Sequence, residues 1–331
     1  MAIVPYADDS PMTSNRFLSS NGPEGRMMPW PSLAARAFCL DCGAGETLFY
    51  FDAVPPEAFD SSSPVFVLVH GLGDEADSWR HIIPLLNARG YRVLAPDLPG
   101  FGRSVAPGRI SLKNHVAAVL RLLAAACPGS PVFLAGNSMG AAITEAAAIQ
   151  KPELIRGIVL LDGSIPGGPA NPGLFALAKL LFSRKWYRAY RDDPEGVWAS
   201  LYPYYADLDA MPPEDREFLR HRVMARVQSS TQERAFFATQ RSLVCAFLTS
   251  SSGFARKIRE YKGKILLIWG EKDTIVPLSS TNVFMSLRPD AKLEIISGAG
   301  HLPQQEKPEE TARIMADFAE GILQDSCFVS E

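Results

Sequence analysis

A serine at position 138 lies in the pentapeptide G-N-S-M-G (136–140), between an apolar run at 132–135 and an alanine-rich stretch that starts at 141. A strand, a tight turn and a helix in that order would hold the Ser138 hydroxyl clear of the backbone. The flanking glycines suit such a turn, because a side chain there would collide with the neighbouring strand or helix. The pattern predicts that Ser138 is a nucleophile, which needs a base to remove its proton.

The chain has five histidines that could provide this base. His301 lies in the loop S-G-A-G-H-L-P, just after an apolar run near the C-terminus. Doubly wound sheets place their sites at the carboxyl ends of strands, so this is the expected position. His70 closes an apolar run in a turn, and the rest lie on helical patterns: His81, His115 and His221. We therefore predict that His301 takes the serine proton.

A carboxylate must fix the tautomer of this histidine and stabilise its charged form. Asp273 follows the apolar run 265–270 in G-E-K-D-T-I-V-P. The chain order of nucleophile, acid and histidine favours it. Asp162 ends the neighbouring run 157–163 and is a rival, because an acid on that strand could also reach the histidine; we prefer a capping role for it. The predicted catalytic triad is Ser138, Asp273 and His301.

Negative charge that develops on a carbonyl oxygen has to be met by fixed hydrogen-bond donors. The backbone N–H of Met139, at the start of the predicted helix, is one candidate. The second is the backbone N–H of Leu72, in the loop H-G-L-G-D that follows the apolar run 65–69. We predict that these two groups form an oxyanion hole.

Short apolar runs bounded by turn signals predict the strands that position these groups. The later runs, at 65–69, 91–96, 132–136, 157–163, 265–270 and 292–297, are mostly continuous, as is typical of strands buried on both faces of a parallel sheet. Helical patterns separate them at 79–89, 112–126, 141–150 and 309–323. The alternation predicts an α/β fold with a doubly wound, mostly parallel sheet.

Two stretches depart from this alternation. Residues 1–35 are rich in Pro, Ser, Asn and Gly and predict an N-terminal extension. Residues 164–253 begin in a Gly/Pro-rich hinge and then show only helical patterns with frequent aromatic residues. We expect a helical cap there, inserted into a core made of residues 36–163 and 254–325. Charges in 212–226 match a helix dipole, with acidic residues before arginines.

The composition limits partners and cofactors. A net charge of −3 without a long basic run gives no field for nucleic acid. We find no transmembrane segment of roughly 18 apolar residues and no secretory signal, so we expect a cytoplasmic protein. Cys39 and Cys42 form a C-x-x-C pair without a second ligand pair, which favours ordinary thiols. We expect no metal and no organic cofactor, because zincin, Walker A and dinucleotide motifs are absent.

The motifs V-H-G-L-G-D, A-P-D-L-P-G-F-G-R-S, G-N-S-M-G, W-G-E-K-D and G-A-G-H-L-P resemble, in this order, those of the α/β-hydrolase superfamily over about residues 45–322. The resemblance is to serine-nucleophile members of the esterase and lipase kind with a helical cap. It implies the triad and the oxyanion hole given above. It also implies that four residues shape a loop at the edge of the site without acting chemically: Asp97, Gly100, Gly102 and Arg103.

Ser138 separates this chain from epoxide hydrolases and haloalkane dehalogenases, which carry an aspartate at that position. We expect a carboxylic ester hydrolase that works through an acyl-enzyme. The aromatic and leucine-rich cap predicts a small-molecule ester with an apolar acyl or aryl group, in contact with Trp186, Tyr190 and Leu302. The oligomeric state stays open.

Carbon–carbon bond hydrolysis is the first alternative. G-N-S-M-G is similar to the same segment of hydrolases that cleave aromatic ring-fission products. Those proteins usually have a tryptophan directly after the catalytic histidine, where this chain has Leu302. They also use a cap arginine to bind the substrate's acid groups. Three arginines could serve here: Arg184, Arg188 and Arg191.

Three further hypotheses stay open. A proline-type aminopeptidase would need cap carboxylates that face a free amine, and Glu195, Asp207 and Asp209 are available. An acyltransferase would use the same acyl-enzyme but pass the acyl group to an alcohol. A non-catalytic ligand receptor could share the fold, because fold does not fix function. The complete set of three triad residues argues against the receptor.

Overall fold

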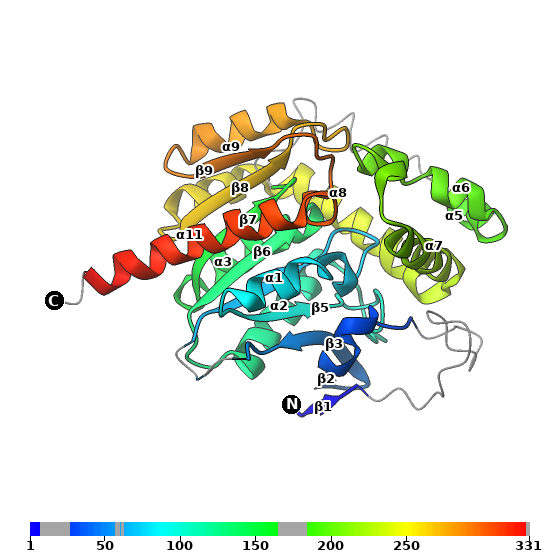
Figure 1. Cartoon of the computed structure of the whole chain (residues 1–331), viewed down its shortest axis with the longest axis horizontal. Coiled ribbons are helices and arrows are strands. Elements are labelled where there is room, and N and C mark those ends of the chain that lie inside the picture. Colours follow the sequence, from blue (N-terminus) through cyan, green and yellow to red (C-terminus); the bar gives the residue numbers. More distant parts are fainter. Residues whose placement is uncertain (7–26, 57–59, 61–62, 165–183, 329–331) are drawn as a thin grey trace.

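A nine-stranded sheet lies at the centre of the computed structural model, which describes residues 1–6, 27–56, 60, 63–164 and 184–328 (Figure 1). Its strands are β1 (Ile3–Pro5), β2 (Ala37–Gly43), β3 (Glu46–Ala53), β4 (Val65–Val69), β5 (Arg92–Pro96), β6 (Val132–Asn137), β7 (Ile155–Leu161), β8 (Lys264–Gly270) and β9 (Lys292–Ile296). Their order across the sheet is β1-β2-β3-β5-β4-β6-β7-β8-β9. In this spatial order, the pairs from β1 through β3 to β5 are antiparallel, and all pairs from β5 through β4 to β9 are parallel. The predicted doubly wound, mostly parallel sheet is confirmed.

The central strands are continuously apolar because both faces of the sheet are covered. Every residue of β4 and of β6 is buried. Successive side chains of β4 point to opposite faces: Val65, Val67 and Val69 pack into one core cluster, and Phe66 and Leu68 pack into the other. Two hydrophobic layers therefore fix the register of this strand, since a slip by one residue would exchange them.

Helices that follow the strands supply these two layers. α2 (Leu112–Ala126), α3 (Met139–Gln150) and α9 (Thr281–Leu287) pack on the layer that contains Val67. α1 (Ile82–Ala88) and α11 (Pro308–Phe328) pack on the layer that contains Phe66. The short α10 (Pro303–Glu306) precedes α11. The remaining short turns near the sheet are 3-10 helices: η1 (Pro31–Arg36), η2 (Ala76–Trp79), η3 (Pro152–Leu154) and η7 (Leu278–Ser280).

All the regular elements that the structure describes between β7 and β8 are helices, and α5, α6 and α7 lie beside the sheet at the right of Figure 1. Its elements are α5 (Arg184–Ala189), η4 (Tyr190–Asp192), α6 (Pro194–Ala199), η5 (Tyr202–Tyr204), η6 (Leu208–Ala210), α7 (Pro213–Gln228) and α8 (Ser230–Glu260). They enclose a third hydrophobic cluster, which includes Trp198, Leu219 and Phe237. We call residues 184–246 the cap.

The element bounds differ in two places from the division that the sequence predicts. α8 continues past 253 to Glu260, and its Ile258 packs into the core of the sheet, so one helix joins cap and core. A strand forms at Ile3–Pro5, within the stretch expected as an extension, because it pairs with β2 at the edge of the sheet. Most of the Gly/Pro-rich hinge lies outside the described residues. The division into extension, core and cap stays a prediction.

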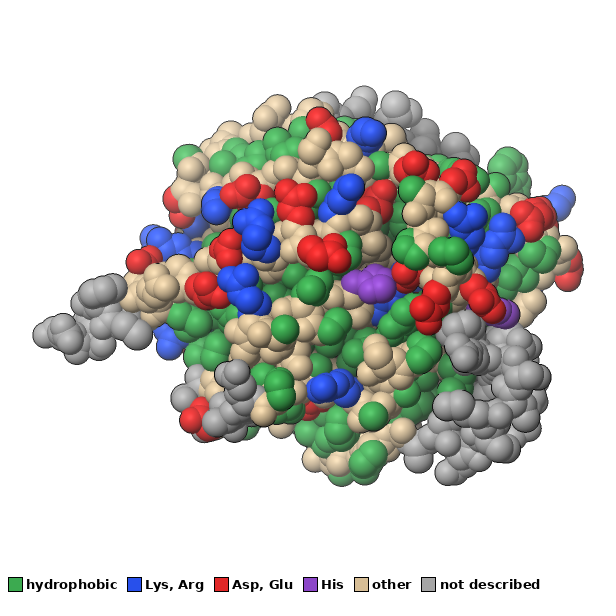
Figure 2. Space-filling model, in the orientation of Figure 1, with side chains coloured by type: hydrophobic (Ala, Val, Ile, Leu, Met, Phe, Trp, Pro, Cys, Tyr) green, Lys and Arg blue, Asp and Glu red, His purple; other side chains and the backbone are tan. Residues whose placement is uncertain are grey.

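The surface carries charges of both signs. Figure 2 shows Lys and Arg side chains mixed with Asp and Glu side chains over one face of the molecule. Within the described ranges, no helix combines the length and the hydrophobicity that a membrane span needs.

Candidate active site

Ser138 lies at the turn between β6 and α3, where the sequence predicts it. Its backbone has φ +56° and ψ −115°, a conformation that a non-glycine residue adopts at an energetic cost. Its N–H donates to the carbonyl of Leu161, 2.8 Å away. A Cβ on Gly136 would lie 2.2 Å from the Gly140 carbonyl oxygen, and one on Gly140 would lie 2.1 Å from that of Val69. Both flanking positions therefore require glycine.

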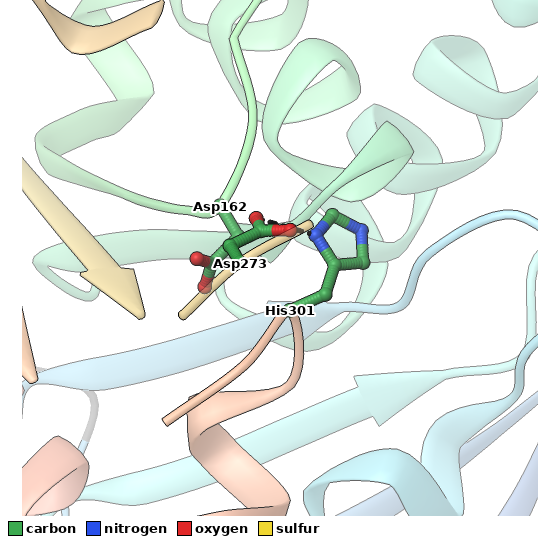
Figure 3. Close-up of side chains that lie close together, drawn as sticks. All are labelled: Asp162, Asp273 and His301. Atoms are coloured by element: carbon green, nitrogen blue, oxygen red, sulfur yellow. Dashed lines mark hydrogen bonds and ion pairs between the residues drawn. The ribbon is translucent and has the colours of Figure 1, made fainter. Parts of the chain in front are cut away.

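His301 and Asp273 form a buried pair in the loops after β9 and β8. Nδ1 of His301 lies 2.8 Å from Oδ2 of Asp273 (Figure 3). The other oxygen of Asp273 accepts hydrogen bonds from the N–H groups of Ile275 (2.8 Å) and Val276 (3.0 Å). A carboxylate held in this way keeps the proton of a neutral imidazole on Nδ1 and leaves Nε2 free to act as a base.

Backbone hydrogen bonds hold the His301 loop from both sides. The N–H of His301 donates to the carbonyl of Tyr204 in the cap (2.9 Å), and Nδ2 of Asn137 donates to the carbonyl of His301 (3.0 Å). The Glu306 carboxylate accepts from the N–H groups of Gly300 (2.6 Å) and Ala206 (2.7 Å). Burial raises the pKa of Glu306. Asn137 and Glu306 thus position the histidine loop, and no pattern in the sequence predicts either role.

Asp162, the rival acid, lies behind Asp273. Its Oδ1 accepts a hydrogen bond from the N–H of Gly270 (2.8 Å), at the end of β8. Of the two acids, Asp273 is the one that bonds the imidazole. This bond joins the ends of β7 and β8, and the capping role at the hinge of the cap stays a prediction.

We also considered whether these acids and the histidine could bind a metal ion. In the described ranges, one set of three His, Cys, Asp or Glu side chains has ligand atoms within 4.8 Å of one another, and it consists of Asp162, Asp273 and His301. Nδ1 of His301 and Oδ2 of Asp273 already bond each other, and the remaining Asp273 oxygen takes two N–H donors. A metal ion would have to displace these bonds, so the set fits proton chemistry better than metal binding.

The C-x-x-C pair is divided by the sheet. Cys39 packs against the core cluster on one face of β2, and Cys42 packs against the cluster on the other face. Both are free thiols, and burial raises the pKa of each. Two side chains on opposite faces of one strand cannot bind the same ion, in agreement with the prediction of ordinary thiols.

The two predicted oxyanion donors lie next to the serine. Within the part of the chain that the structure describes, neither the N–H of Leu72 nor that of Met139 donates to another residue. A Cβ on Gly71, directly before Leu72, would lie 3.5 Å from the Ser138 Cβ, so this loop runs against the serine turn. Free donors beside the nucleophile can stabilise an oxyanion.

His70 supports this loop and does not act as a base. Its Nδ1 donates to the carbonyl of Gly71 (2.8 Å), and its Nε2 accepts from the N–H of Leu98 (2.9 Å). Burial lowers the pKa of His70. With both ring nitrogens engaged, His70 is a structural histidine, as its position in a turn suggests.

The segment that the resemblance assigns to the edge of the site is held by buried charges. Arg103 donates from Nε to Oδ2 of Asp97 (2.7 Å) and from NH2 to Oδ2 of Asp77 (2.6 Å). A Cβ on Gly102 would lie 2.3 Å from the Asp97 carboxylate, and one on Gly100 would lie 2.7 Å from a neighbouring side chain. These residues shape the loop, and their groups are engaged with one another.

Ser138 and His301 both line one cavity of about 460 Å³ between the sheet and the cap. Its walls are mainly apolar, and among them are Phe101, Val197, Leu201, Leu219, Val223, Phe236 and Ile275. Two of the predicted substrate contacts, Tyr190 and Leu302, line it. Trp186 does not: it lies on α5, and its side chain is 69% exposed. The structure therefore does not place Trp186 at this cavity, in contrast to the prediction.

Buried ion pairs join the cap to the loop after β4. Arg222 of α7 bonds Glu75 (2.9 Å) and Asp77 (2.8 Å). One turn later, Arg226 bonds Asp74 (2.7 Å) and Glu75 (2.5 Å). We call these five residues the cap–core seam. The sequence pattern matches both arginines to the dipole of their own helix, whereas the structure pairs them with acids about 150 positions earlier in the chain.

The other charged cap residues singled out in the sequence are paired away from the cavity. Arg184, Arg188 and Arg191 surround Glu233, at distances of 3.8, 2.9 and 2.7 Å. The three cap carboxylates have partners of their own. Glu195 bonds Arg220, Asp207 accepts from backbone N–H groups of η6, and Asp209 accepts from the Tyr202 hydroxyl.

Comparisons with known proteins identify the family of this chain. The model of the alpha/beta hydrolase family matches residues 66–314. The 2-hydroxy-6-oxo-6-phenylhexa-2,4-dienoate hydrolase of Comamonas testosteroni is 30% identical over 261 residues, which cover 76% of this chain and 86% of that protein. Lipase 1 of Psychrobacter immobilis is 26% identical over 248 residues, 74% of each chain.

Solved structures share the fold. The thermophilic esterase from Thermogutta terrifontis superposes with a TM-score of 0.68 at 20% identity, over 87% of this chain and 99% of that one. A membrane phospholipase A of bacterial origin superposes with a TM-score of 0.69 at 24% identity, over 86% of each chain. By its sequence match and its fold, this chain is a hydrolase that belongs to the alpha/beta hydrolase family.

Proposed function

We propose that this hydrolase cleaves carboxylic esters with an apolar acyl or aryl group, through an acyl-enzyme on Ser138. The observation that carries the proposal is the buried His301–Asp273 pair, which opens onto the same apolar cavity as the serine. Small-molecule sites are typically concave and apolar, with a few well-placed polar groups, and this cavity has that character.

The proposed reaction has two stages, acylation of Ser138 and its deacylation by water. Nε2 of His301 takes the hydroxyl proton of Ser138 while Oγ attacks the ester carbonyl. The N–H groups of Leu72 and Met139 bind the oxyanion, and loss of one such donor typically costs about 3 kcal/mol of transition-state stabilisation. His301 then gives its proton to the leaving alcohol, and the alcohol departs. Water, activated by the same imidazole, releases the acid and restores Ser138. The groups of this chain suffice for these steps.

The charges around the cavity favour a neutral ester over an acid substrate. Within the described residues, Arg226 is the one lysine or arginine that lines the cavity, and its guanidinium is already bonded to Asp74 and Glu75. The three arginines considered for binding a substrate carboxylate surround Glu233 instead. The dienoate hydrolases among the relatives act, by their names, on carboxylates. This charge balance is why we place ester hydrolysis before carbon–carbon bond cleavage.

The cavity also offers no unpaired carboxylate, among the described residues, to bind the free amine of a peptide substrate. Within the described ranges, Asp74 is the one carboxylate that lines the cavity, and it is already paired with Arg226. The three cap acids considered for an aminopeptidase do not line the cavity. We therefore do not favour peptide cleavage at a free N-terminus.

Two assays test the proposal. A fluorophosphonate probe should label the wild type and the Ser200→Ala variant but not Ser138→Ala. Ser200 is the matched control, because it lines the same cavity and its hydroxyl donates to a backbone carbonyl. An unlabelled wild type would contradict the serine mechanism and would leave the receptor hypothesis.

The second assay compares p-nitrophenyl esters of graded chain length with a ring-fission dienone acid. We expect turnover of the esters with little cleavage of the dienone. Rapid dienone cleavage with slow ester turnover would replace the proposal by carbon–carbon bond hydrolysis. Faster product release on adding an alcohol, with formation of a new ester, would indicate an acyltransferase.

A further inference from the structure

A second acid is buried directly behind the imidazole-bonded carboxylate. Asp162 ends β7 and is completely inaccessible to solvent, and so is the side chain of Asp273. One oxygen of each acid and one ring nitrogen of His301 all lie within 4.8 Å of one another (Figure 3). The proposed triad gives Asp273 a role but gives none to Asp162.

The hydrogen bonds of the two acids differ. Asp273 accepts three donors, from the N–H groups of Ile275 and Val276 and from the His301 ring. Asp162 accepts one, from the N–H of Gly270 to its Oδ1. Its Oδ2 is buried, and no donor from the described residues reaches it. An ionised carboxylate with one oxygen unsatisfied in a dry environment would be costly, whereas a protonated oxygen could donate.

The charges that face Asp162 also oppose its ionisation. Asp273 in the loop after β8 is its nearest charged neighbour, Glu306 on α10 acts in the same direction, and His301 lies beyond Asp273. Burial raises the pKa of Asp162, and the negative charge of Asp273 raises it further. Two neighbouring carboxyl groups without a cation between them cannot both be charged at low cost.

We infer that Asp162 is a neutral carboxylic acid in the resting enzyme and that its Oδ2–H donates a hydrogen bond to Asp273, so the two acids share one negative charge. Asp162 is then a positioning residue that acts on His301 through Asp273. The inference rests on the proposed function, because it assigns Asp162 a task in that triad. The proton stays on Asp162 throughout the reaction, and His301 exchanges its own proton with Ser138 and the leaving group.

This hydrogen bond has two consequences. It weakens Asp273 as a hydrogen-bond acceptor and so lessens the stabilisation that this carboxylate gives to the protonated imidazole. It also gives the Asp273 carboxylate a further donor, which helps to hold it in place. Without the bond we expect the acid limb of the pH–rate profile to move toward higher pH.

Asp162→Asn and Asp162→Leu separate this role from packing. Asp162 has φ +47°, a conformation that aspartate and asparagine tolerate best among non-glycine residues, so Asn fits the backbone. The amide can donate to Asp273 and accept from Gly270, as the protonated acid does, while leucine can do neither. We expect Asn to keep kcat/KM within about threefold of the wild type, with the same acid limb. We expect Leu to shift the acid limb upward by about one pH unit and to lower kcat/KM at neutral pH roughly tenfold.

The readouts are the pH profile of ester hydrolysis and the pH profile of fluorophosphonate labelling. A loss of more than about a hundredfold in Asp162→Asn would show that Asp162 acts as an ionised carboxylate and would overturn the inference. An unshifted acid limb in Asp162→Leu would overturn it as well. If the wild type shows neither serine labelling nor hydrolysis, the proposed function itself is contradicted, and this outcome is distinct from a failure of the inference about Asp162.

A direct measurement covers the case in which Asp162→Leu does not fold. The infrared spectrum of the wild type at neutral pH should contain the C=O stretch of a protonated, buried carboxyl group, and the spectrum of Asp162→Asn should lack it. A difference spectrum, wild type minus Asp162→Asn, that lacks this band would contradict a proton on Asp162.

Discussion

Two regions of the molecule hold charged groups out of water by different means. One is the end of the sheet that carries Ser138, Asp273 and His301, which we call the rim, and the other is the cap–core seam. At the rim, Ser138, Asp273 and His301 each lie in the turn or loop that follows a strand, and most of the hydrogen bonds that hold them involve backbone N–H and carbonyl groups. At the seam, side chains hold side chains: Arg222 and Arg226 meet acids that precede them by 145 to 152 positions. Geometry is set by the main chain in one region and by charge pairing in the other.

The difference shows what each region requires. Catalysis needs one hydroxyl, one ring and one carboxylate in a fixed arrangement, and strand ends of a packed sheet vary little in position. The seam needs only to neutralise two guanidinium groups and three carboxylates where water is excluded. A buried ion pair of this kind contributes little to the free energy of folding, but removal of one partner leaves the other charge buried and uncompensated. Variants should therefore affect activity at the rim and stability at the seam.

The largest effect is expected at the rim. Asp273→Asn should keep the fold and the two N–H contacts of the side chain but remove the charge that fixes the His301 tautomer. We expect kcat for an ester to fall about 10,000-fold, with an unchanged melting temperature within a few degrees. Steady-state kinetics and thermal unfolding measure the two effects. A mild loss of activity would mean that Asp162 can take over as the triad acid.

At the seam, Arg222→Met should act on stability. The side chain of Arg222 is 1% exposed, and its removal leaves Glu75 with one cation fewer and Asp77 with Arg103 alone. We expect a loss of about 3–5 kcal/mol in the free energy of unfolding, or loosening of the cap as a separate transition. Denaturant unfolding checks the value.

The matched control for this variant lies on the same helix. Arg220 pairs with Glu195 at the surface, where the side chains are 41% and 78% exposed. Arg220→Met should cost no more than about 1 kcal/mol. Equal effects of the two substitutions would show that burial at the seam does not matter and would remove the contrast between the regions.

The seam also predicts how stability depends on pH. Burial alone would raise the pKa of Glu75, but Arg222 and Arg226 hold it well below its usual range. A carboxyl with a depressed folded-state pKa contributes stability that is complete above the unfolded value of about 4.3 and is lost as the pH falls toward the folded value. Glu75→Gln should therefore be less stable at neutral pH, yet lose stability less steeply below pH 4.3, by up to about 1.4 kcal/mol per pH unit. Parallel curves for the two proteins would contradict this account.

The contrast also explains what the sequence could predict. The pentapeptide around Ser138, the loop of His301 and the position of Asp273 are local patterns, each tied to the end of one apolar run, so strand order and chain order were enough to assemble them. Glycines 136 and 140 add a signal that the structure explains, because a Cβ at either would meet a backbone carbonyl.

Contacts between distant side chains left no such signal. Nothing in the spacing of Arg222 and Arg226 distinguishes a pair that binds Glu75 from one that faces water. Trp186 and Tyr190 lie four positions apart, and the sequence could not tell which of them faces the cavity, because that depends on how α5 packs against α7 and α8. The hydrogen bonds of Glu306 to Gly300 and Ala206 likewise join segments that only the fold brings together.

The smallest expected effect tests the cap as a recognition surface. Tyr190 lines the cavity, whereas Trp186 is exposed on the preceding helix. Tyr190→Ala should lower kcat/KM for esters with a long or aromatic acyl group by about tenfold and change that for acetate esters little, because only the larger groups reach the cap wall. Trp186→Ala is the control and should leave the selectivity between acyl groups unchanged. A reversed order of the two variants would mean that α5 is rotated in the working enzyme, and the division between a rim that reacts and a cap that selects would have to be redrawn.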